Sequence, residues 1–522
     1  MPRALLALVA LLLCLTGGRR AHADVLDEVR AKGVLVWGAD QEGGGPYVYP
    51  RDDDPDEVTG FEVELAALVA KELGVRAQFF QGNWDKLPDL ARTGQIHVVL
   101  NGYELTPERE AVLEATKPYY VYGLQLLVKK GSPLDGFDAL KQKGDTKVGV
   151  LGGSAAEVLV GDRLGPKAAV SYDGNTDAMR EVETGKLDAT VQDTPIVAFY
   201  LPRFPALVVA GETTGEGLYV MYAKKGERRL VEAIDRALLS LYTSGALEQL
   251  YAKYGLWNQQ QRKLGALLGA PPSPGPAPAG SATPAPEQPS AAAPPPIRAS
   301  ERLRGFSVLT TYGGTLLEAA GITILLSTIS FPRAVAIGLA VALGRLYGPG
   351  WLARLLAVYV EVLRGTPLML QLYFLFFFLP ELGVRLPAYA TAIIGLAVNY
   401  SAYESEIYRA GIQAIPHGQM EAALSLGMSR TQAIRHVVVP QATRIVIPPV
   451  VNDFIALFKD TSVCSVVTVV ELTKRYSILN MSTQATIELT IMTALLYLIM
   501  SLPLGILSRR LEARLGVRAI TA

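Results

Sequence analysis

The stretch Glu421-Ala422-Ala423-Leu424-Ser425-Leu426-Gly427, followed by Val437-Val438-Val439-Pro440, lies between two strongly apolar segments of the chain. Residues 419–426 predict a short helix with the small Ala422 and Ala423 on its surface. Gly427 suits the left-handed position that ends a helix, and Ser429 can cap a second helix through residue 436. Pro440 is expected to stop that helix. The spacing predicts a rigid helix-turn-helix open to another protein, against the simpler alternative of an ordinary amphipathic loop helix.

The composition indicates a membrane protein with more than one domain. The chain has 522 residues, 50% of them hydrophobic, and a mean hydropathy of +0.25. It is therefore too long for one domain and too apolar for an ordinary soluble enzyme. The formal net charge is zero, so the charge balance gives no indication of a nucleic-acid partner.

Residues 1–23 have the pattern of a signal peptide. Arg3 precedes an apolar run over residues 4–15, and the small-x-small tripeptide Ala21-His22-Ala23 precedes Asp24. The run is too short to span a bilayer, which takes about 20 residues. An uncleaved anchor is the alternative, and it would also place the following domain outside. Removal of this segment leaves Cys464 as the one cysteine, so we expect no intramolecular disulfide.

Two regions follow residue 23, the first of ordinary composition and the second of low complexity. Residues 24–265 alternate short β-rich runs, such as 34–37, 97–100 and 148–151, with amphipathic helical stretches such as 61–73. This alternation favours a mostly parallel sheet covered on both faces. Residues 266–305 form a linker whose centre is almost entirely Pro, Ala, Ser and Gly. Such a segment cannot bury enough apolar surface to fold and is expected to act as an extended tether.

Residues 306–522 predict an all-α membrane domain with five spans. The spans are residues 319–343, 367–379, 388–408, 445–470 and 487–507, the second beginning earlier, within 355–363. If the chain enters from outside, the internal segments hold Arg345, Arg354, Arg409, Arg430, Arg435, Arg509, Arg510, Arg514 and Arg518. The external ones hold Arg385, Lys474 and Arg475. This positive-inside asymmetry places the loop at Glu421 in the cytoplasm.

Several polar residues fall within these predicted spans: Glu404, Glu406, Asn452, Asp453, Lys459 and Asp460. Such groups are costly in hydrocarbon, so they should face a partner, a cavity or a boundary. A structural Asp/Lys pair between helices and a role in a translocation path remain equal alternatives.

The membrane domain resembles the permeases of polar amino-acid ABC importers over residues 310–515. The resemblance is carried by the loop at Glu421 and by four further blocks. These are Glu361-Val-Leu-Arg-Gly-Thr-Pro367, Ala402-Tyr-Glu-Ser-Glu-Ile407, Ile412-Gln-Ala-Ile-Pro416 and Asn452-Asp-Phe-Ile-Ala-Leu-Phe-Lys-Asp-Thr-Ser462. It implies that Glu421, Ala422, Ala423, Gly427 and Pro440 couple this chain to a cytoplasmic ABC ATPase.

Four segments of the region before the linker carry a second resemblance. They are Gly60-Phe-Glu-Val-Glu-Leu65, Trp84-Asp-Lys-Leu-Pro-Asp-Leu90, Thr106-Pro-Glu-Arg109 and Lys117-Pro-Tyr-Tyr120. With them, residues 30–258 resemble the periplasmic amino-acid-binding proteins of glutamine and lysine/arginine type. In that family two lobes close over one amino acid, and here the second lobe would take residues 121–211. The fold implied for the whole chain is a two-lobed α/β periplasmic-binding-protein fold followed by an all-α transmembrane permease domain.

The resemblance also implies which residues hold the ligand. Arg109 corresponds to the arginine that clamps the ligand carboxylate, which a guanidinium matches in bidentate fashion. Ser154 and Ala155 open a helix whose free N–H groups suit the same carboxylate. Asp193 corresponds to the aspartate that holds the α-amino group. Further contacts are implied for Asp40, Trp84, Gly102 and Glu104; plain core packing is the alternative for Trp84, and a surface salt bridge for Arg109 or Asp193.

This sequence departs from the binding-protein pattern at Glu104, where relatives place Ser or Thr. Together with Asp40, Asp193 and Glu42, it would make an acidic pocket around Arg109, which a cationic ligand such as arginine, lysine or histidine would compensate. Glu104 could equally pair with Arg109, or serve the α-amino group alone.

The resemblances together imply an ATP-driven importer subunit for polar amino acids, and the acidic pocket favours basic ones among them. The sequence contains no Gly-x-x-x-x-Gly-Lys-Ser/Thr loop, so ATP and Mg²⁺ are expected on a partner ATPase dimer and no cofactor on this chain. Five spans are too few for a complete pathway in this family, so a homodimer in the lipid of the cytoplasmic (inner) membrane is the simplest arrangement. A heterodimer with a second permease is the alternative. A ligand-gated channel or a sensor built on the same binding fold is the alternative.

Overall fold

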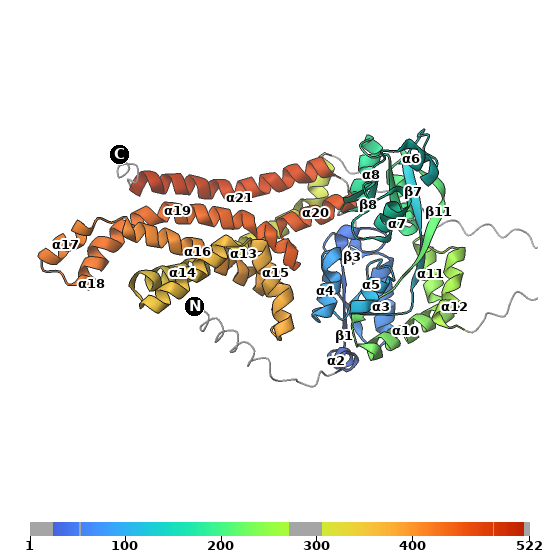
Figure 1. Ribbon diagram of the computed structural model, residues 1–522, viewed down its shortest axis with the longest axis horizontal. Coiled ribbons are helices and arrows are strands. Elements are labelled where there is room, and N and C mark those ends of the chain that lie inside the picture. Colours follow the sequence, from blue (N-terminus) through green and yellow to red (C-terminus); the bar gives the residue numbers. More distant parts are fainter. Residues whose placement is uncertain (1–23, 52–53, 173, 271–304, 484, 516–522) are drawn as a thin grey trace, which may run out of the picture. The chain divides into compact units, whose positions relative to one another are not determined.

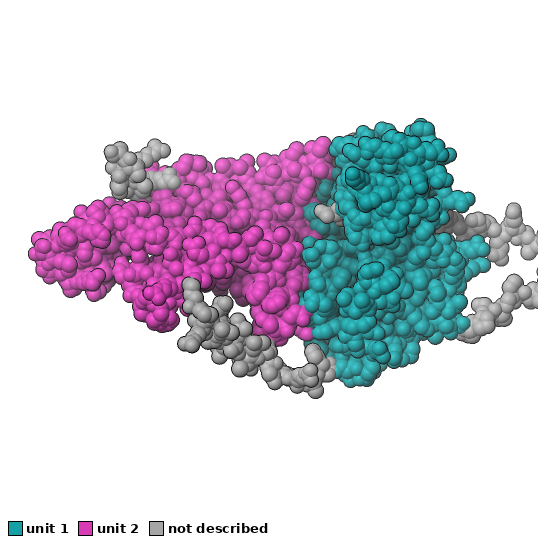
Figure 2. Space-filling view, in the orientation of Figure 1, with its two compact units in different colours: residues 1–304, 477–485 teal, residues 305–476, 486–522 magenta. Residues whose placement is uncertain are grey.

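The computed structural model describes residues 24–51, 54–172, 174–270, 305–483 and 485–515. The chain divides into two compact units, coloured separately in Figure 2: residues 1–304 with 477–485, and residues 305–476 with 486–522. The predicted signal peptide and most of the predicted linker lie outside the described residues. Figure 1 labels the helices and strands within each unit.

The first lobe of the binding unit is built on a five-stranded sheet of order β4-β1-β5-β12-β6. The strands are β1 (Val34–Ala39), β4 (Arg76–Gln81), β5 (Val98–Val99), β6 (Leu113–Ala115) and β12 (Tyr222–Lys224). β1 is parallel to both β4 and β5, whereas β12 is antiparallel to its neighbours. Helices α3 (Phe61–Glu72) and α4 (Leu87–Arg92) pack on this sheet, and the short α5 (Pro107–Val112) precedes β6.

The second lobe has a sheet of order β11-β7-β10-β8-β9. Its strands are β7 (Tyr120–Lys129), β8 (Val148–Leu151), β9 (Ala169–Tyr172), β10 (Ala189–Asp193) and β11 (Leu207–Tyr219). β8, β9 and β10 run parallel, but β7 is antiparallel to both β10 and β11, so the sheet is mixed. The helices of this lobe are α6 (Phe137–Lys143), α7 (Ala155–Leu164), α8 (Asn175–Thr184) and α9 (Thr194–Tyr200).

The long strands β7 and β11 carry the chain between the two lobes. They pair from Tyr120 with Tyr219 to Lys129 with Leu207, with register shifts between Ala210 and Gly217. The chain then returns to the first lobe through α10 (Arg228–Thr243), α11 (Ala246–Lys253) and α12 (Leu264–Leu268). Because α12 is folded with Leu264 and Leu268 fully buried, the domain extends beyond the expected end at residue 265.

The second unit is helical. Its elements are α13 (Phe306–Tyr347), α14 (Gly350–Gly365), α15 (Leu368–Tyr373), η5 (Phe374–Phe378), η6 (Leu379–Leu382), α16 (Ala388–Gln413), α17 (His417–Ser425), α18 (Arg430–Ala433), η7 (Ile434–Val438), α19 (Val439–Asp460), η8 (Thr461–Val467) and α21 (Thr486–Leu515). Helix α20 (Leu472–Thr483) begins in this unit, and its residues from 477 onward belong to the first unit. α13 packs along α16, α16 against α19, and α19 against α21. Gly338 of α13 permits the first of these contacts, because a Cβ there would lie 2.9 Å from the carbonyl oxygen of Ser401.

By length and apolar composition, two helices of the described chain could cross a membrane, α13 and α21. α14 and the following residues through Leu382 form a pair bent by 108°, which raises the number to three if the pair is one broken span. If the pair is one span, the second predicted span begins earlier in the chain and is not straight. α16 and α19 carry the polar residues noted above and do not qualify by this measure, so five spans are not confirmed.

Candidate functional site

A small cavity lies between the two lobes of the binding unit. Six of the residues expected at a ligand site line it: Asp40, Trp84, Gly102, Glu104, Ser154 and Asp193. Its volume is about 50 Å³, far below the roughly 300–1,000 Å³ of typical ligand pockets. The lobes are therefore closed on each other, and their own side chains fill the site.

Arg109 reaches this site from α5. Thr106 caps that helix by accepting the N–H of Arg109 at 3.3 Å. The guanidinium lies 4.9 Å from the ring centre of Tyr103 and 5.4 Å from that of Trp84, within cation–π range. Its Nη2 donates to the carbonyl oxygen of Gly153 in the second lobe, at 3.2 Å. The aromatic rings thus hold the guanidinium at the boundary between the lobes.

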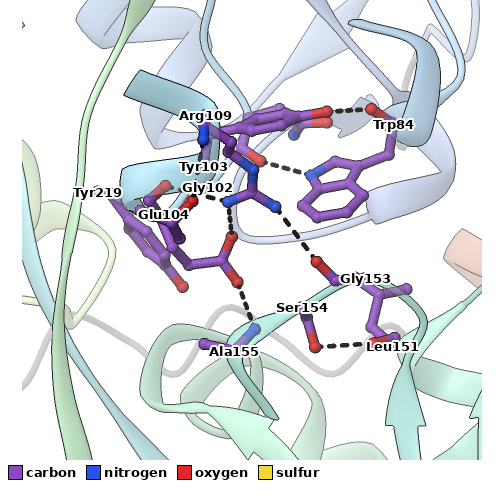
Figure 3. A network of polar contacts seen from close by, with 12 residues as sticks. Trp84, Gly102, Tyr103, Glu104, Arg109, Leu151, Gly153, Ser154, Ala155 and Tyr219 are labelled. Carbon is purple, nitrogen blue, oxygen red and sulfur yellow. Dashed lines mark hydrogen bonds and ion pairs between the residues drawn. The ribbon is translucent and has the colours of Figure 1, made fainter. Parts of the chain in front are cut away.

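Glu104 bridges the two groups that were expected to hold a ligand carboxylate (Figure 3). Its Oε2 accepts from Nη1 of Arg109 at 2.5 Å, and its Oε1 accepts the N–H of Ala155, the first residue of α7, at 3.0 Å. The Ser154 hydroxyl instead donates to the carbonyl oxygen of Leu151 at 2.7 Å. Of the alternatives left open by the sequence, the pairing of Glu104 with Arg109 is the one present.

Trp84 and Asp40 form one connected group in the first lobe. Trp84 stacks on Tyr103 with ring centres 4.7 Å apart, and its Nε1 donates to the carbonyl oxygen of Asn101 at 3.0 Å. Asp40 accepts the N–H groups of Trp84 and Glu42 at 2.9 and 3.0 Å and the side-chain amide of Gln81 at 2.8 Å. The Asp40 carboxylate therefore contributes its charge to the cavity while its oxygens order the surrounding loops.

Asp193 is the last residue of β10 and occupies the N-cap position of α9. Its Oδ2 accepts a hydrogen bond from the hydroxyl of Tyr219, and that hydroxyl lies 2.8 Å from the hydroxyl of Tyr47. Burial raises the pKa of Asp193 to about 7, the charge of Glu104 raises it as well, and the Tyr219 bond opposes both. Asp193 is therefore poised to change charge near neutral pH.

Gly102 lines the cavity, but its amide is already used. Its N–H donates to Oε1 of Glu62 at 2.7 Å, and the hydroxyl of Tyr119 donates to the same oxygen. Glu62 is fully buried, and burial raises its pKa to about 7, while these hydrogen bonds lower it. The backbone contact expected from Gly102 would have to come from its carbonyl group.

Four residues at or beside the site were missed from the sequence: Tyr47, Asn101, Tyr103 and Tyr219. Asn101 and Tyr103 flank the expected Gly102, and strand alternation would have turned both away from the face of Gly102 and Glu104. Tyr219 ends the crossing strand β11, where the chain re-enters the first lobe. Its partnership with Asp193 depends on the pairing register of β11, which the sequence does not reveal.

The loop of the helical unit is a helix, a turn and a second helix, as expected. α17 ends at Ser425, Gly427 adopts a φ of +84°, and Ser429 forms a capping box with Gln432 of α18. Glu421 and Ala422 are exposed, and Leu426 beside them is 80% exposed. The exposed tip of the loop therefore combines a carboxylate with an apolar side chain.

Two expectations about this loop are wrong. Ala423 is 4% exposed, so it packs inward and offers no surface to another protein. Pro440 does not stop the second helix: α18 continues through the π-helical segment η7 into α19, with Pro440 in its first turn. A proline lacks an N–H donor, and the wider hydrogen-bonding pattern of η7 directly before it accommodates that loss.

The polar residues of the helical unit separate into two groups. Glu406 forms ion pairs with Arg345 and Arg409. Asp453 and Asp460 line a cavity of about 520 Å³ with Arg364, Asn399, Tyr400 and Tyr403. Tyr400 donates to Asp460 at 2.7 Å, and Lys459 is exposed. The acidic residues of α19 thus face a cavity, and no ion pair of either with Lys459 is found among the described residues.

Both units match known families. Residues 35–256 match bacterial extracellular solute-binding proteins, family 3, and residues 334–517 match the binding-protein-dependent transport system inner membrane component. The probable amino-acid ABC transporter permease protein y4tG of Sinorhizobium fredii is 38% identical, over 37% of this chain and 83% of its own. The glutamine transport system permease protein GlnP of Escherichia coli is 36% identical, over 39% of this chain and 93% of its own.

Among solved structures, the chain is similar to the crystal structure of the ancestral amino acid-binding protein AncCDT-1, a precursor of cyclohexadienyl dehydratase. That similarity covers 44% of this chain and 99% of the other, at 30% sequence identity and a TM-score of 0.41.

Proposed function

Because the chain belongs to the family of amino-acid ABC transporter permeases and carries a solute-binding domain fused in front, we propose that it captures a basic amino acid outside the cell and passes it through its own membrane domain. The observation that most supports amino-acid binding is the pair of carboxylate-binding groups at the boundary between the two lobes. Arg109 and the first amide of α7 together hold a carboxylate, here that of Glu104. An amino acid presents a carboxylate of the same kind.

The preference for a basic ligand follows from the charges of the cavity. Asp40, Glu104 and Asp193 line it, and Arg109 is the cation beside them. A second cation on the ligand would balance the remaining carboxylates, whereas a neutral side chain would leave them uncompensated in a buried site. Arginine, lysine and histidine meet this requirement.

In the membrane we propose five crossings: α13, the bent pair of α14 and α15, α16, α19 and α21. Several polar groups of α16 and α19 have suitable surroundings: Glu406 forms ion pairs with Arg345 of α13 and Arg409 of α16, and Asp453 and Asp460 line the cavity. The excess of arginine in the segments assigned to the inside supports a cytoplasmic position for the α17–α18 loop and an external one for the binding domain. Reactivity of single cysteines at Arg385 and Arg430 with an impermeant thiol reagent tests this orientation.

The exposed tip of the α17–α18 loop is the proposed contact for a cytoplasmic ATPase, which would bind ATP and Mg²⁺. Glu421, Ala422 and Gly427 lie at its surface, while Ala423 supports it from beneath and Pro440 lies at the base. Two copies of the chain would complete the pathway through the lipid bilayer. The relatives found give no support to the alternative of a ligand-gated channel or sensor.

Calorimetric titration of the purified full chain in nanodiscs with each of the twenty amino acids tests the proposal. We expect arginine, lysine or histidine to bind most tightly. Absence of binding by every amino acid would refute the amino-acid function. Tighter binding of glutamine or glutamate than of all three basic amino acids would refute the basic preference.

A further inference from the structure

The carboxylate of Glu104 has the partners that a ligand carboxylate would need. It is bound by a guanidinium from the first lobe and by the first amide of a ten-residue helix from the second lobe. Its side chain is 4% exposed, so water replaces neither partner. The site is therefore already occupied by an internal carboxylate.

Glu104 is also fixed in place from behind. Its carbonyl oxygen accepts hydrogen bonds from Nη1 of Arg109 and from the hydroxyl of Tyr222, each at 3.0 Å. Its backbone forms an antiparallel bridge to Tyr219 at the end of β11. Only the side chain of Glu104 is then free to change position while the backbone stays in register.

The Glu104 contacts cross from one lobe to the other. The bond to Ala155 and the bond from Arg109 to Gly153 both join the lobes, and the cavity that remains is small. Opposite charges and charge-assisted hydrogen bonds are strongest in such buried surroundings. These bonds stabilise the closed arrangement of the two lobes.

We infer that Glu104 is an internal substitute for the ligand carboxylate, which holds the lobes closed and must be displaced when an amino acid binds. This inference rests on the proposed function. A ligand carboxylate takes over Arg109 and the α7 amide, and the released Glu104 needs a new cation. A basic side chain supplies that cation, whereas a neutral amino acid leaves Glu104 buried and unpaired, which is strongly unfavourable. The displacement therefore selects for a basic ligand.

Two variants of the full chain in nanodiscs test the inference. Glu104→Gln removes the charge and keeps an acceptor at the same distance, whereas Glu104→Ser removes the charge and shortens the side chain, so that its hydroxyl cannot bridge Arg109 and Ala155. Glu108→Gln and Glu108→Ser are the matched controls, because Glu108 is an exposed carboxylate in α5. Spin labels on cysteines introduced at the exposed Lys71 and Lys167, one in each lobe, report the distance between the lobes. All variants also carry Cys14→Ser, and Cys464 is buried, so neither native cysteine competes for label.

Without ligand, the wild type and the Glu108 controls should show short distances between labels. Glu104→Ser should shift the population to longer distances, which arginine should reverse, with Glu104→Gln between the two. The ratio of arginine to glutamine affinity should fall about tenfold or more in Glu104→Ser, mainly because glutamine binds better.

An unchanged distance distribution in both Glu104 variants, or an unchanged affinity ratio, would overturn the inference while leaving the proposed function intact. A wild type that binds no amino acid would overturn the proposed function, and the inference with it.

Discussion

The hydroxyl of Tyr219 donates a hydrogen bond to Asp193, across the junction between the crossing strand β11 and the end of β10. Tyr219 is fully buried and also contacts the hydroxyl of Tyr47, at 2.8 Å. Burial raises the pKa of Tyr219 well above its usual value, so it remains a donor throughout the physiological range. The bond therefore stabilises the charged form of Asp193, whose pKa burial would otherwise raise further.

We expect the affinity for a basic amino acid to rise with pH between about 6 and 8. The pKa of Asp193 in the ligand-free domain is raised to about 7, so the carboxylate is largely protonated below that pH and must lose its proton to pair with an ammonium group. Calorimetry of arginine binding at pH 5.5–8.5, in buffers of different ionisation enthalpy, should show release of up to about one proton. An affinity for arginine that is constant over this range would contradict the assignment.

Replacement of Tyr219 by phenylalanine should move that pH dependence upward. The variant keeps the ring, but Asp193 loses a donor to its charged form, so the Asp193 pKa rises further. At pH 7 we expect arginine to bind roughly tenfold more weakly, with partial recovery at pH 8.5. Tyr242→Phe is a control, since its hydroxyl contacts Arg262 far from the site in sequence and structure. Equal pH profiles for Tyr219→Phe and wild type would rule out this role.

Local sequence signals were sufficient for much of the binding site. Arg109 follows a Thr-Pro helix start, and Ala155 follows a glycine-rich turn, so both positions could be predicted from the pattern and the resemblance. The pairing of Glu104 with Arg109 was one of the alternatives that the sequence left open. Its second partner, the N–H of Ala155, could not be predicted, because Ala155 belongs to the other lobe. Tyr219 was missed for a related reason: its position depends on the register of two long strands separated by about a hundred residues in the chain.

The membrane domain shows where residue patterns are ambiguous. α17 has nine residues, too few for its apolar positions to fix which side faces the protein, and Ala423 was assigned to the wrong face. Pro440 has the sequence position of a helix stop, but packing continues α18 into α19 through a π-helical segment. The bend between α14 and α15 falls at Gly365-Thr366-Pro367, a break that the apolar run alone conceals.

Glu62→Gln should stabilise the binding domain at alkaline pH. The pKa of Glu62 is raised by burial from 4.5 to about 7 in the folded protein. The folded state therefore holds the proton more tightly than the unfolded state, and stability present below pH 4.5 is lost as the pH rises through 7. Glutamine keeps an acceptor for Gly102 and Tyr119 without titrating, so it should recover up to about 3 kcal/mol at pH 8.

Thermal unfolding of the full chain in detergent, followed by tryptophan fluorescence at pH 5 and pH 8, measures this effect. Glu72→Gln is the control, because Glu72 is exposed at the end of the same helix. A midpoint difference between the two pH values that is as large in Glu62→Gln as in wild type would exclude Glu62 as its source.

Gly338→Ala should destabilise the permease domain, whereas Gly321→Ala on the same helix should not. A Cβ at Gly338 would lie 2.6 Å from the Cβ of Glu404 and 2.9 Å from the carbonyl oxygen of Ser401, so α13 and α16 would have to separate. Gly321 has no atom within 4 Å of the corresponding position. We expect a loss of about 1–3 kcal/mol for Gly338→Ala and a neutral or slightly favourable effect for Gly321→Ala. Equal melting temperatures in detergent for the two variants would show that this close approach is not required.

Glu421→Lys should abolish ATP-driven transport in proteoliposomes that contain the partner ATPase, and leave amino-acid binding unchanged. Glu421 is exposed on α17 next to the exposed Leu426, so the reversal of charge changes the loop surface and not its packing. Glu381→Lys, an equally exposed carboxylate in η6, is the control for charge reversal.

Leu426→Asp should also block transport by making the tip polar. Ala423→Leu should instead lower the yield of folded protein, because Ala423 is buried beneath the loop and a larger side chain overpacks it. Transport that persists at the wild-type rate in both Glu421→Lys and Leu426→Asp would show that this loop is not where the ATPase acts.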